Sequence, residues 1–408
     1  MIARNAEEVI AEADRIAARA GQLPTVGGYF SYHPYARERR GEAPDPILVG
    51  NNEKIAYNLS INQPVFHWGA LRNSTKMAEL RSKVAEGSTA EAYRILVDQV
   101  RNHYLQLVVL KASLHRARFN QQVADEALVI ARSKRQQNVL SEADLFTPTV
   151  TAEQARLRTD QAEFNYEASK KSLAKLCGVD ALAEGDVAEG IPAISPNSAA
   201  VEQVVNEFLG QGEPDTYYLQ NLRRGIEIEK LSYDIHNTRL KPKINATAGV
   251  SQDEQTFSFA NALTSKYKIQ TTYAGVSVNW TIFDSFSTRS AKIASMARRR
   301  ELERAYKMEA ADLLMNVQNL KRQLEFSARG LAISEKFLAS AEDGVRVVED
   351  NLRRGLASET AVSDARLLLQ TRQLETYAAR NDYLLKLSGL LSTTLNDPAL
   401  NLLPAKYR

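Results

Sequence analysis

The sequence predicts a mainly helical chain that also carries four β-strands of membrane-spanning length. Three observations support this fold class. One plan occurs twice at a constant offset, each copy contains segments that alternate strictly between apolar and polar residues, and each copy continues as a very long helical pattern. We therefore expect two tandem halves, each made of a strand pair followed by an antiparallel pair of long helices.

The repeat is clearest where Ser60-Ile61-Asn62 recurs as Ser277-Val278-Asn279, and the spacing from Ser60 to Ser277 defines the repeat offset. The same offset relates further pairs along the two halves: Leu96 and Leu313, Val100 and Val317, Leu107 and Leu324, Ser141 and Ser358, and Tyr166 and Tyr383. A register kept over this length predicts that both halves follow one order of strand, polar loop, strand, very long helix, short break and second helix.

Each half has an alternating segment before its long helical pattern. Lys54 to Phe66 alternates in the first half, and a matching segment precedes Phe283 in the second. Such a period of two is typical of a strand with two different faces. The residues of one face, which we expect to contact lipid in a barrel, are Ile55, Tyr57, Leu59, Ile61, Ala274, Val276, Val278 and Trp280.

The four predicted strands cannot close a barrel alone, because open sheet edges would leave backbone groups unpaired in hydrocarbon. Copies of the chain must therefore associate. Two copies give eight strands, whose interior is filled by side chains, whereas three copies give twelve strands and leave a lumen. We expect a homotrimer with a twelve-stranded barrel.

The helical patterns run from the end of each alternating segment to Gln137 and to Arg354. About 70 residues at about 1.5 Å per residue make a helix roughly 100 Å long, which predicts a coiled-coil-like wall. A short break then reverses the chain, since Asn or Gly suits a helix C-cap and Ser the next N-cap. The predicted tips are Asn138, Val139, Leu140 and Ser141 in the first half, and Arg354, Gly355, Leu356 and Ser358 in the second.

The predicted organisation has seven segments. They are an N-terminal helix at 1–23, a first β-hairpin at 24–67, a first long helical hairpin at 68–178, a linker with two shorter helices at 179–241, a second β-hairpin at 242–284, a second long helical hairpin at 285–396 and a tail at 397–408.

Composition excludes several function classes. The 52 basic and 49 acidic residues are mixed along the chain, so its net charge of +3 indicates neither a nucleic-acid partner nor an anionic surface. Cys177 is the single cysteine, which excludes an intrachain disulfide. The five histidines lack metal-ligand spacing, and no phosphate-binding loop or nucleophile motif occurs. We expect no enzyme activity, metal or cofactor.

The segment from Gly275 to Asp284, with sequence GVSVNWTIFD, resembles the strand-to-helix signature of the TolC-like outer-membrane efflux proteins. The stretch from Leu59 to Phe66 is a degenerate copy of it, and Arg354-Gly355-Leu356-Ala357-Ser358 resembles the family's turn between two helices. The resemblance covers nearly the whole chain. It implies a homotrimer in the outer membrane, in contact with lipid through its barrel, with a helical tunnel that extends into the periplasm.

The resemblance also implies a function without reaction chemistry. The trimer would be the exit duct for efflux or type I secretion, opened by a periplasmic membrane-fusion adaptor and an inner-membrane pump. The two tips would then be the adaptor-docking sites, because apolar residues at a solvent-exposed helix break need a reason. The alternative is that these apolar residues pack against one another within each tip.

Two acidic residues match implied gate positions. Asp364 lies where the family narrows the tunnel with carboxylates, although Ala361 replaces the second acidic residue there. Asp144 matches an acidic tip position, with Leu352 in place of its aromatic partner. Each residue also has a local interpretation: Asp144 follows Ser141 as in an ordinary first helical turn, and Asp364 could pair with a nearby basic residue, Arg366 or Arg353.

A soluble coiled-coil scaffold with a small sheet is the alternative function. Aromatic residues gather around the strand ends and favour the barrel, because interfacial aromatics flank the apolar band of a membrane barrel. Only residues 1–23 precede the first strand, whereas two helical segments precede the corresponding strand of the second half. We therefore expect the natural precursor to begin further upstream, with a signal peptide.

Overall fold

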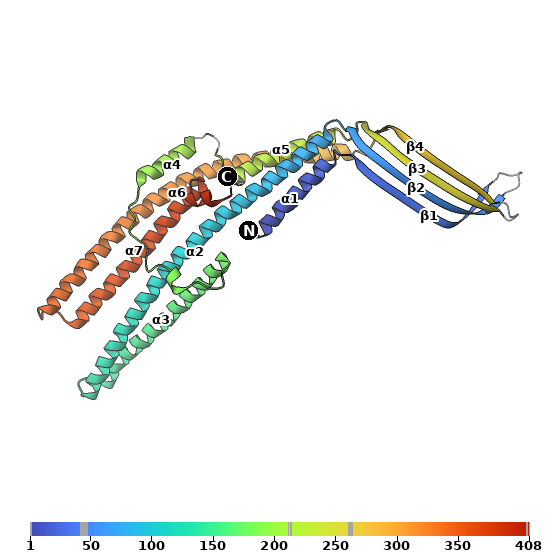
Figure 1. Ribbon diagram of the computed structural model, residues 1–408. Helices are drawn as coiled ribbons and strands as arrows, with labels where there is room; N and C mark the ends of the chain where they lie inside the picture. The colour runs from blue at the N-terminus through green and yellow to red at the C-terminus, as the bar shows by residue number, and fades with distance from the viewer. Residues whose placement is uncertain are drawn as a thin grey trace. The chain divides into compact units, whose positions relative to one another are not determined.

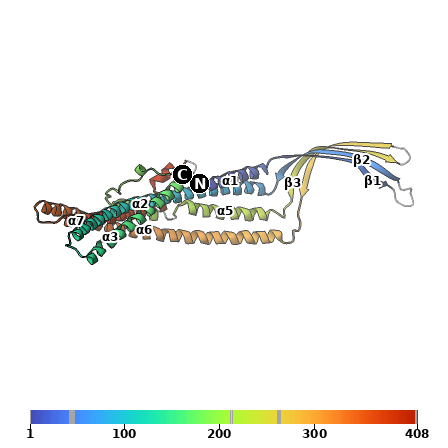
Figure 2. The same ribbon diagram turned by 90° about the horizontal axis from the view of Figure 1, so that it is seen from below.

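Four strands form one antiparallel sheet, in which neighbours in sequence are neighbours in space (Figures 1 and 2). The computed structural model describes residues 2–40, 48–210, 212, 214–259, 264–404 and 407. The strands are β1 (Thr25–Arg40), β2 (Leu48–Phe66), β3 (Lys243–Phe259) and β4 (Thr264–Asn279). Pairing of β2 with β3 joins the two halves of the chain, so the sheet contains both predicted hairpins.

The helices reproduce the sequence repeat. They are α1 (Ile2–Ala20), α2 (Ala70–Gln136), α3 (Glu142–Cys177), α4 (Ser198–Gly210), α5 (Tyr217–Asn237), α6 (Ser287–Arg353) and α7 (Glu359–Thr393), with short 3₁₀ turns at Glu184–Asp186 and Pro398–Leu402. Both α2 and α6 contain 67 residues. Since α6 begins and ends at the positions that the repeat offset assigns to the two ends of α2, the predicted offset is confirmed at both helix ends.

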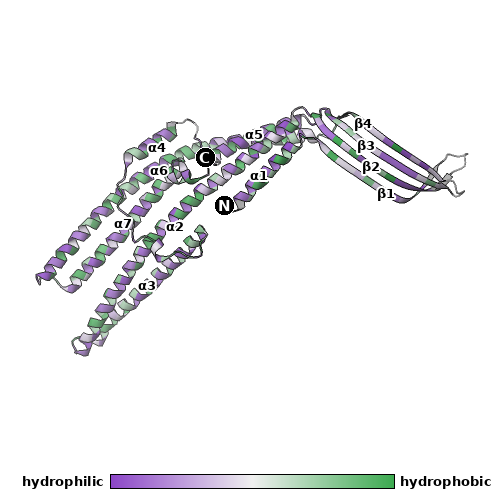
Figure 3. Ribbon diagram, in the orientation of Figure 1, coloured by the Kyte–Doolittle hydropathy of each residue, from purple (hydrophilic) through white to green (hydrophobic). Residues whose placement is uncertain are grey.

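The chain divides into two compact units. The first unit contains residues 1–89 and 217–308, with the sheet, α1 and α5. The second unit contains residues 90–216 and 309–408, with the two turns that join α2 to α3 and α6 to α7. In Figure 3, hydrophobic and hydrophilic residues alternate along the long helices instead of forming continuous apolar stretches. Among the described residues, no helix is long and apolar enough to cross a bilayer.

The second unit contains two related apolar clusters. One is built around Leu107 and Tyr166, and the other around Leu324 and Tyr383, which are their counterparts in the second half of the repeat. All four side chains are buried. The repeat therefore extends from the pattern of elements to the individual residues that pack each hairpin, which is what a coiled-coil-like wall requires.

A buried ion pair fixes the end of the chain to α2. Arg101 donates to both carboxylate oxygens of Asp397, and the Ala399 backbone N–H donates to Oδ1 at 2.9 Å. Burial alone would raise the pKa of Asp397, but these hydrogen bonds hold the pKa below its ordinary value. The carboxylate therefore stabilises the fold above its unfolded pKa, and this contribution is lost as pH falls through the folded pKa.

Asp397→Asn should destabilise the protein by about 3 kcal/mol at neutral pH. This value is near the lower end of the cost of breaking a buried ion pair, because Arg101 is partly exposed. Thermal unfolding followed by circular dichroism in detergent measures this. The difference from the parent should shrink below about pH 4, where aspartate protonates in the unfolded chain. Asp343→Asn, which removes an exposed carboxylate paired with Arg346, serves as the control and should cost less than about 1 kcal/mol. Equal losses in both variants would contradict the argument.

Candidate functional site

The sheet has one apolar face and one polar face. The strand register aligns Leu59 with Gly28 and Val250, and Ile61 with Val26 and Ala248. It thus gathers the apolar residues on one face: Val26, Phe30, Ile55, Tyr57, Leu59, Ile61, Val250, Ala274, Val276 and Val278. The other face carries Asn58, Ser60, Asn62, Thr247, Ser251 and Ser277, together with the aromatic side chains of Tyr29 and Tyr273. A sheet with one apolar face and one polar face suits a wall between lipid and water.

The apolar face is exposed over the height of a membrane. The described residues leave side chains such as Val276 largely uncovered, at 69% of full exposure. On β4 the apolar region begins next to Trp280 and ends near Gln270, where polar residues replace apolar ones. These ten residues at about 3.4 Å each, tilted by about 40°, cover roughly 25 Å, the height of the apolar band of a membrane barrel.

Seven of the eight residues predicted to face lipid lie on the apolar face of the sheet, and the eighth, Trp280, lies just outside it. Trp280 follows β4, which ends at Asn279, and its indole N–H donates to the Leu240 carbonyl at 3.0 Å. Trp68 likewise donates to the Pro242 carbonyl at 2.7 Å and has a positive φ of 55°. The two tryptophans therefore hold the segment before β3, a long-range contact that local sequence patterns do not indicate.

The two tips share one backbone design. Asn138 (φ 56°) and Gly355 (φ 75°) adopt the left-handed conformation that ends α2 and α6. The Val139 N–H donates to Lys134 O and the Leu356 N–H to Asn351 O, the hydrogen bonds of a Schellman motif. Ser141 and Ser358 then cap α3 and α7.

The tips leave apolar side chains in solvent. Val139 and Leu356 are 70% and 76% exposed, whereas Leu140 is half-buried. Backbone hydrogen bonds and the two serines already cap the helix ends at both tips. The turns therefore do not require an apolar side chain at Val139 or Leu356. An exposed apolar pair at a rigid turn is suited to a partner surface.

The two candidate gate carboxylates have different surroundings. Asp144 completes a capping box with Ser141, as in the local interpretation, since the Asp144 N–H donates to Ser141 Oγ and the Ser141 hydroxyl donates to the carboxylate at 2.5 Å. Asp364 is exposed on α7. Arg366 does not pair with it, because its guanidinium donates to Glu349 at 2.7 Å. In the described part of the chain, no carboxylate-to-cation contact within 4.0 Å involves Asp364.

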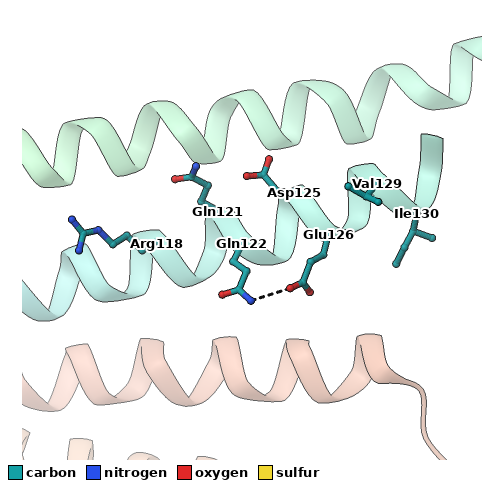
Figure 4. A pocket seen from close by; sticks show the side chains of 7 residues that line it. All are labelled: Arg118, Gln121, Gln122, Asp125, Glu126, Val129 and Ile130. Atoms are coloured by element: carbon teal, nitrogen blue, oxygen red, sulfur yellow. Dashed lines mark hydrogen bonds between the residues drawn. The ribbon is translucent and has the colours of Figure 1, made fainter. Parts of the chain in front are cut away.

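A hollow of about 700 Å³ lies along α2 near its tip (Figure 4). A single helix lines it, through Arg118, Gln121, Gln122, Asp125, Glu126, Val129 and Ile130. Its acidic groups have partners. Asp125 accepts from Arg156 at 2.8 Å, and Glu126 accepts from Gln122 at 2.9 Å, the bond drawn in Figure 4. The hollow is an open helix face with apolar Val129 and Ile130, not a catalytic pocket.

Neither reactive nor metal-binding groups gather elsewhere in the described ranges. No group of three or more His, Cys, Asp or Glu side chains there could hold a metal ion. Cys177 is an exposed free thiol at the end of α3.

Solved structures with this fold include outer-membrane proteins and channels. VceC from Vibrio cholerae is 16% identical, with a TM-score of 0.69 over 96% of this chain and 92% of that one. CmeC from Campylobacter jejuni is 13% identical, with a TM-score of 0.73 over 99% and 87%. MtrE from Neisseria gonorrhoeae, solved in an open state, is 15% identical, with a TM-score of 0.63 over 96% and 85%. At these identities the likeness shows the fold.

The sequence itself also matches a family model. No curated protein sequence matches the chain. The model of the outer membrane efflux proteins, however, matches residues 3–179 and 219–394, which contain both halves of the repeat. The chain therefore belongs to the outer membrane efflux protein family, whose members are transport channels and not enzymes.

Proposed function

We propose that this chain is one subunit of a trimeric outer-membrane duct that serves efflux or type I secretion. The observation that carries the proposal is the exposed apolar face of a sheet whose two edges are open. In the described residues, no strand pairs with the outer edge of β1 or of β4. Unpaired edges cannot lie in hydrocarbon, so β1 of one copy must pair with β4 of the next.

Three copies fit these requirements. Twelve strands close a barrel wide enough for a lumen, and the polar sheet face with Asn58, Ser60 and Thr247 would line it. The helical hairpins would continue the duct into the periplasm. The duct needs only a polar lining and a mouth that can close.

The partners follow from the tips. We propose that a periplasmic membrane-fusion adaptor binds the tip residues Asn138, Val139, Leu140 and Ser141 together with Arg354, Gly355, Leu356 and Ser358, and that the adaptor connects the duct to an inner-membrane pump. The exposed Val139 and Leu356 side chains support this proposal, because they offer an apolar contact surface at the chain's turning points.

Reconstitution tests the function. The protein purified in detergent should have the mass of a trimer and should conduct ions across a planar lipid bilayer after insertion. A monomer that remains soluble and monodisperse without detergent would contradict the proposal and would favour the coiled-coil scaffold.

Asp364 is the candidate gate residue for which the structure leaves a free carboxylate. Threefold symmetry would bring three copies of it toward one axis, where like charges repel one another and attract cations. Asp364→Asn should reduce cation selectivity and weaken divalent-ion block by about tenfold, which is equivalent to about 1.4 kcal/mol of ion binding. Single-channel recording measures both quantities.

A second variant on the same helix controls for charge alone. Glu375→Gln removes one carboxylate from α7 that is paired with Arg372 at 2.7 Å, and it should leave selectivity and block unchanged. If Asp364→Asn behaves like Glu375→Gln, then Asp364 does not lie at the constriction.

A further inference from the structure

Basic side chains gather where the sheet meets the helices. The hydrogen bonds from Trp68 to Pro242 and from Trp280 to Leu240, and the one between His67 and Asn245 at 2.9 Å, bring three chain segments together there. These are the start of α2, the segment between α5 and β3, and the start of α6. Together they present six basic residues, the basic collar: Arg72, Lys76, Arg239, Lys241, Arg289 and Lys292.

The collar has almost no compensating acid. Residues 67–78 and 236–246 contain no Asp or Glu, and residues 280–294 contain only Asp284. That carboxylate caps α6, where it accepts from the Thr288 N–H at 2.9 Å and from the Thr288 hydroxyl. The hydrogen bonds from Thr288, and then the charge of Arg239 in the collar, lower the pKa of Asp284 from its ordinary value.

The six cations are also unpaired. Across the described residues, none of them lies within 4.0 Å of a carboxylate, although basic residues further along the same helices, such as Arg94, Arg118 and Arg299, do form ion pairs. Five of the six are exposed, and Lys292 is half-buried and donates to Asn237 at 2.7 Å. The collar is thus a local surface of one sign in a chain whose net charge is only +3.

The position of the collar identifies its partner. The apolar sheet face ends directly beside it, at Val278 and Trp280, and both tryptophans lie at this boundary, as interfacial aromatics do in membrane proteins. The Lys241 ammonium lies 4.7 Å from the centre of the Trp68 ring, so its charge lies beside a tryptophan of this boundary. If the sheet lies in a bilayer, the groups at this level are lipid headgroups.

We propose that the basic collar binds the phosphates of anionic phospholipids in the leaflet that faces the helical part of the chain. The proposal rests on the proposed function, since it requires the sheet to span a membrane. An acidic partner protein is less suited to this surface, because Lys241 lies over Trp68 and the Trp280 indole is bonded to Leu240, so the collar adjoins the end of the apolar sheet face. Basic residues near an anionic bilayer favour anionic lipid, and salt should weaken this preference.

The two tryptophans allow a direct test. The chain has only two, Trp68 and Trp280, and both border the collar. The purified protein is reconstituted in phosphatidylcholine vesicles that contain either brominated phosphatidylcholine or brominated phosphatidylglycerol, and quenching of tryptophan fluorescence gives the relative affinity of the two lipids. The parent should prefer phosphatidylglycerol by about tenfold at low salt and should lose most of this preference in 0.5 M salt, where the screening length is roughly 4 Å.

Matched variants locate the preference. The triple variant Arg72→Gln, Arg239→Gln and Arg289→Gln removes three exposed collar charges without touching either tryptophan contact, and it should reduce the preference to within about twofold of unity. The control variant Arg298→Gln, Arg299→Gln and Arg300→Gln removes the same charge from α6. Its first position is nine residues beyond Arg289, about 14 Å along the helix, and the variants are compared at 0.1 M salt, where the screening length is about 10 Å. It should keep the parent's preference.

Each outcome decides one question. A parent without lipid preference, a triple variant that keeps the preference, or a control variant that loses it would overturn the collar proposal while leaving the duct intact. Absence of quenching by both brominated lipids would instead show that the tryptophans do not border a bilayer, which contradicts the proposed function itself.

Discussion

Val276→Arg should prevent the chain from assembling as a trimer in the outer membrane. Val276 is exposed on the apolar face, four residues from Trp280 and six from Gln270, and so lies near the middle of the apolar band. An arginine facing lipid near the bilayer midplane costs about 2–4 kcal/mol in each chain. A cost of about 1.4 kcal/mol is already enough for a tenfold fall. Because a trimer contains three copies of the arginine, the amount of assembled protein in the membrane fraction should fall well below a tenth of the parent's.

The neighbouring residue provides the control. Ser277 lies on the polar face, opposite Asn245, so Ser277→Arg places the same side chain toward the proposed lumen. It should assemble at a level close to the parent's and change only conduction. Membrane fractionation followed by gel analysis of unheated samples compares the variants. If both variants assemble equally well, the apolar face does not contact lipid.

Replacing both Leu140 and Leu356 with Asp should abolish export in cells without affecting the trimer. The two leucines occupy the turns that end α2 and α6, and Leu356 is among the most exposed apolar side chains of the described residues. A charge in a hydrophobic contact with the adaptor would be desolvated without a partner, which is costly. Accumulation of an exported dye measures the loss in cells, and conductance of the purified protein in a bilayer should match the parent's.

A separate variant tests whether loss of export comes from the lost apolar contact or from local unfolding of the tips. Ser141→Ala with Ser358→Ala removes the N-caps of α3 and α7, at a cost of about 1 kcal/mol each, but keeps the apolar side chains. The serine hydroxyls are engaged in capping, so export should persist in this variant if the apolar side chains make the contact. Normal export in the leucine variant would exclude docking through these leucines, whereas loss of export in the cap variant would attribute the leucine effect to local unfolding.

Much of the fold could be predicted because its determinants are local and repeated. Gln137 and Arg354 were the predicted ends of the long helices, and the structure ends them at Gln136 and Arg353. Asn138 and Gly355 were predictable caps because the Schellman turn needs a residue that accepts positive φ. The sheet faces followed from a period of two, since a shift of one residue would turn every apolar side chain to the wrong face.

The remaining features depend on contacts between residues far apart in the sequence. Nothing near Trp68 indicates its bond to Pro242, and nothing near Arg366 indicates its partner, Glu349. For the same reason, the overall balance of charge concealed the basic collar, which forms only when three separate segments meet. The role of Asp144 was open in the sequence, and the structure gives it a local partner in Ser141.

The equal lengths of α2 and α6 constrain how this chain can change during evolution. An insertion in α2 alone would move one tip away from the level of the other, and it would also need a matching insertion in α3 to keep the hairpin in register. Length changes should therefore be tolerated only in sets of four, one in each of α2, α3, α6 and α7, at positions that correspond between the two halves of the repeat. Relatives with longer or shorter tunnels should differ by paired insertions or deletions in both halves, in steps that preserve the coiled-coil repeat.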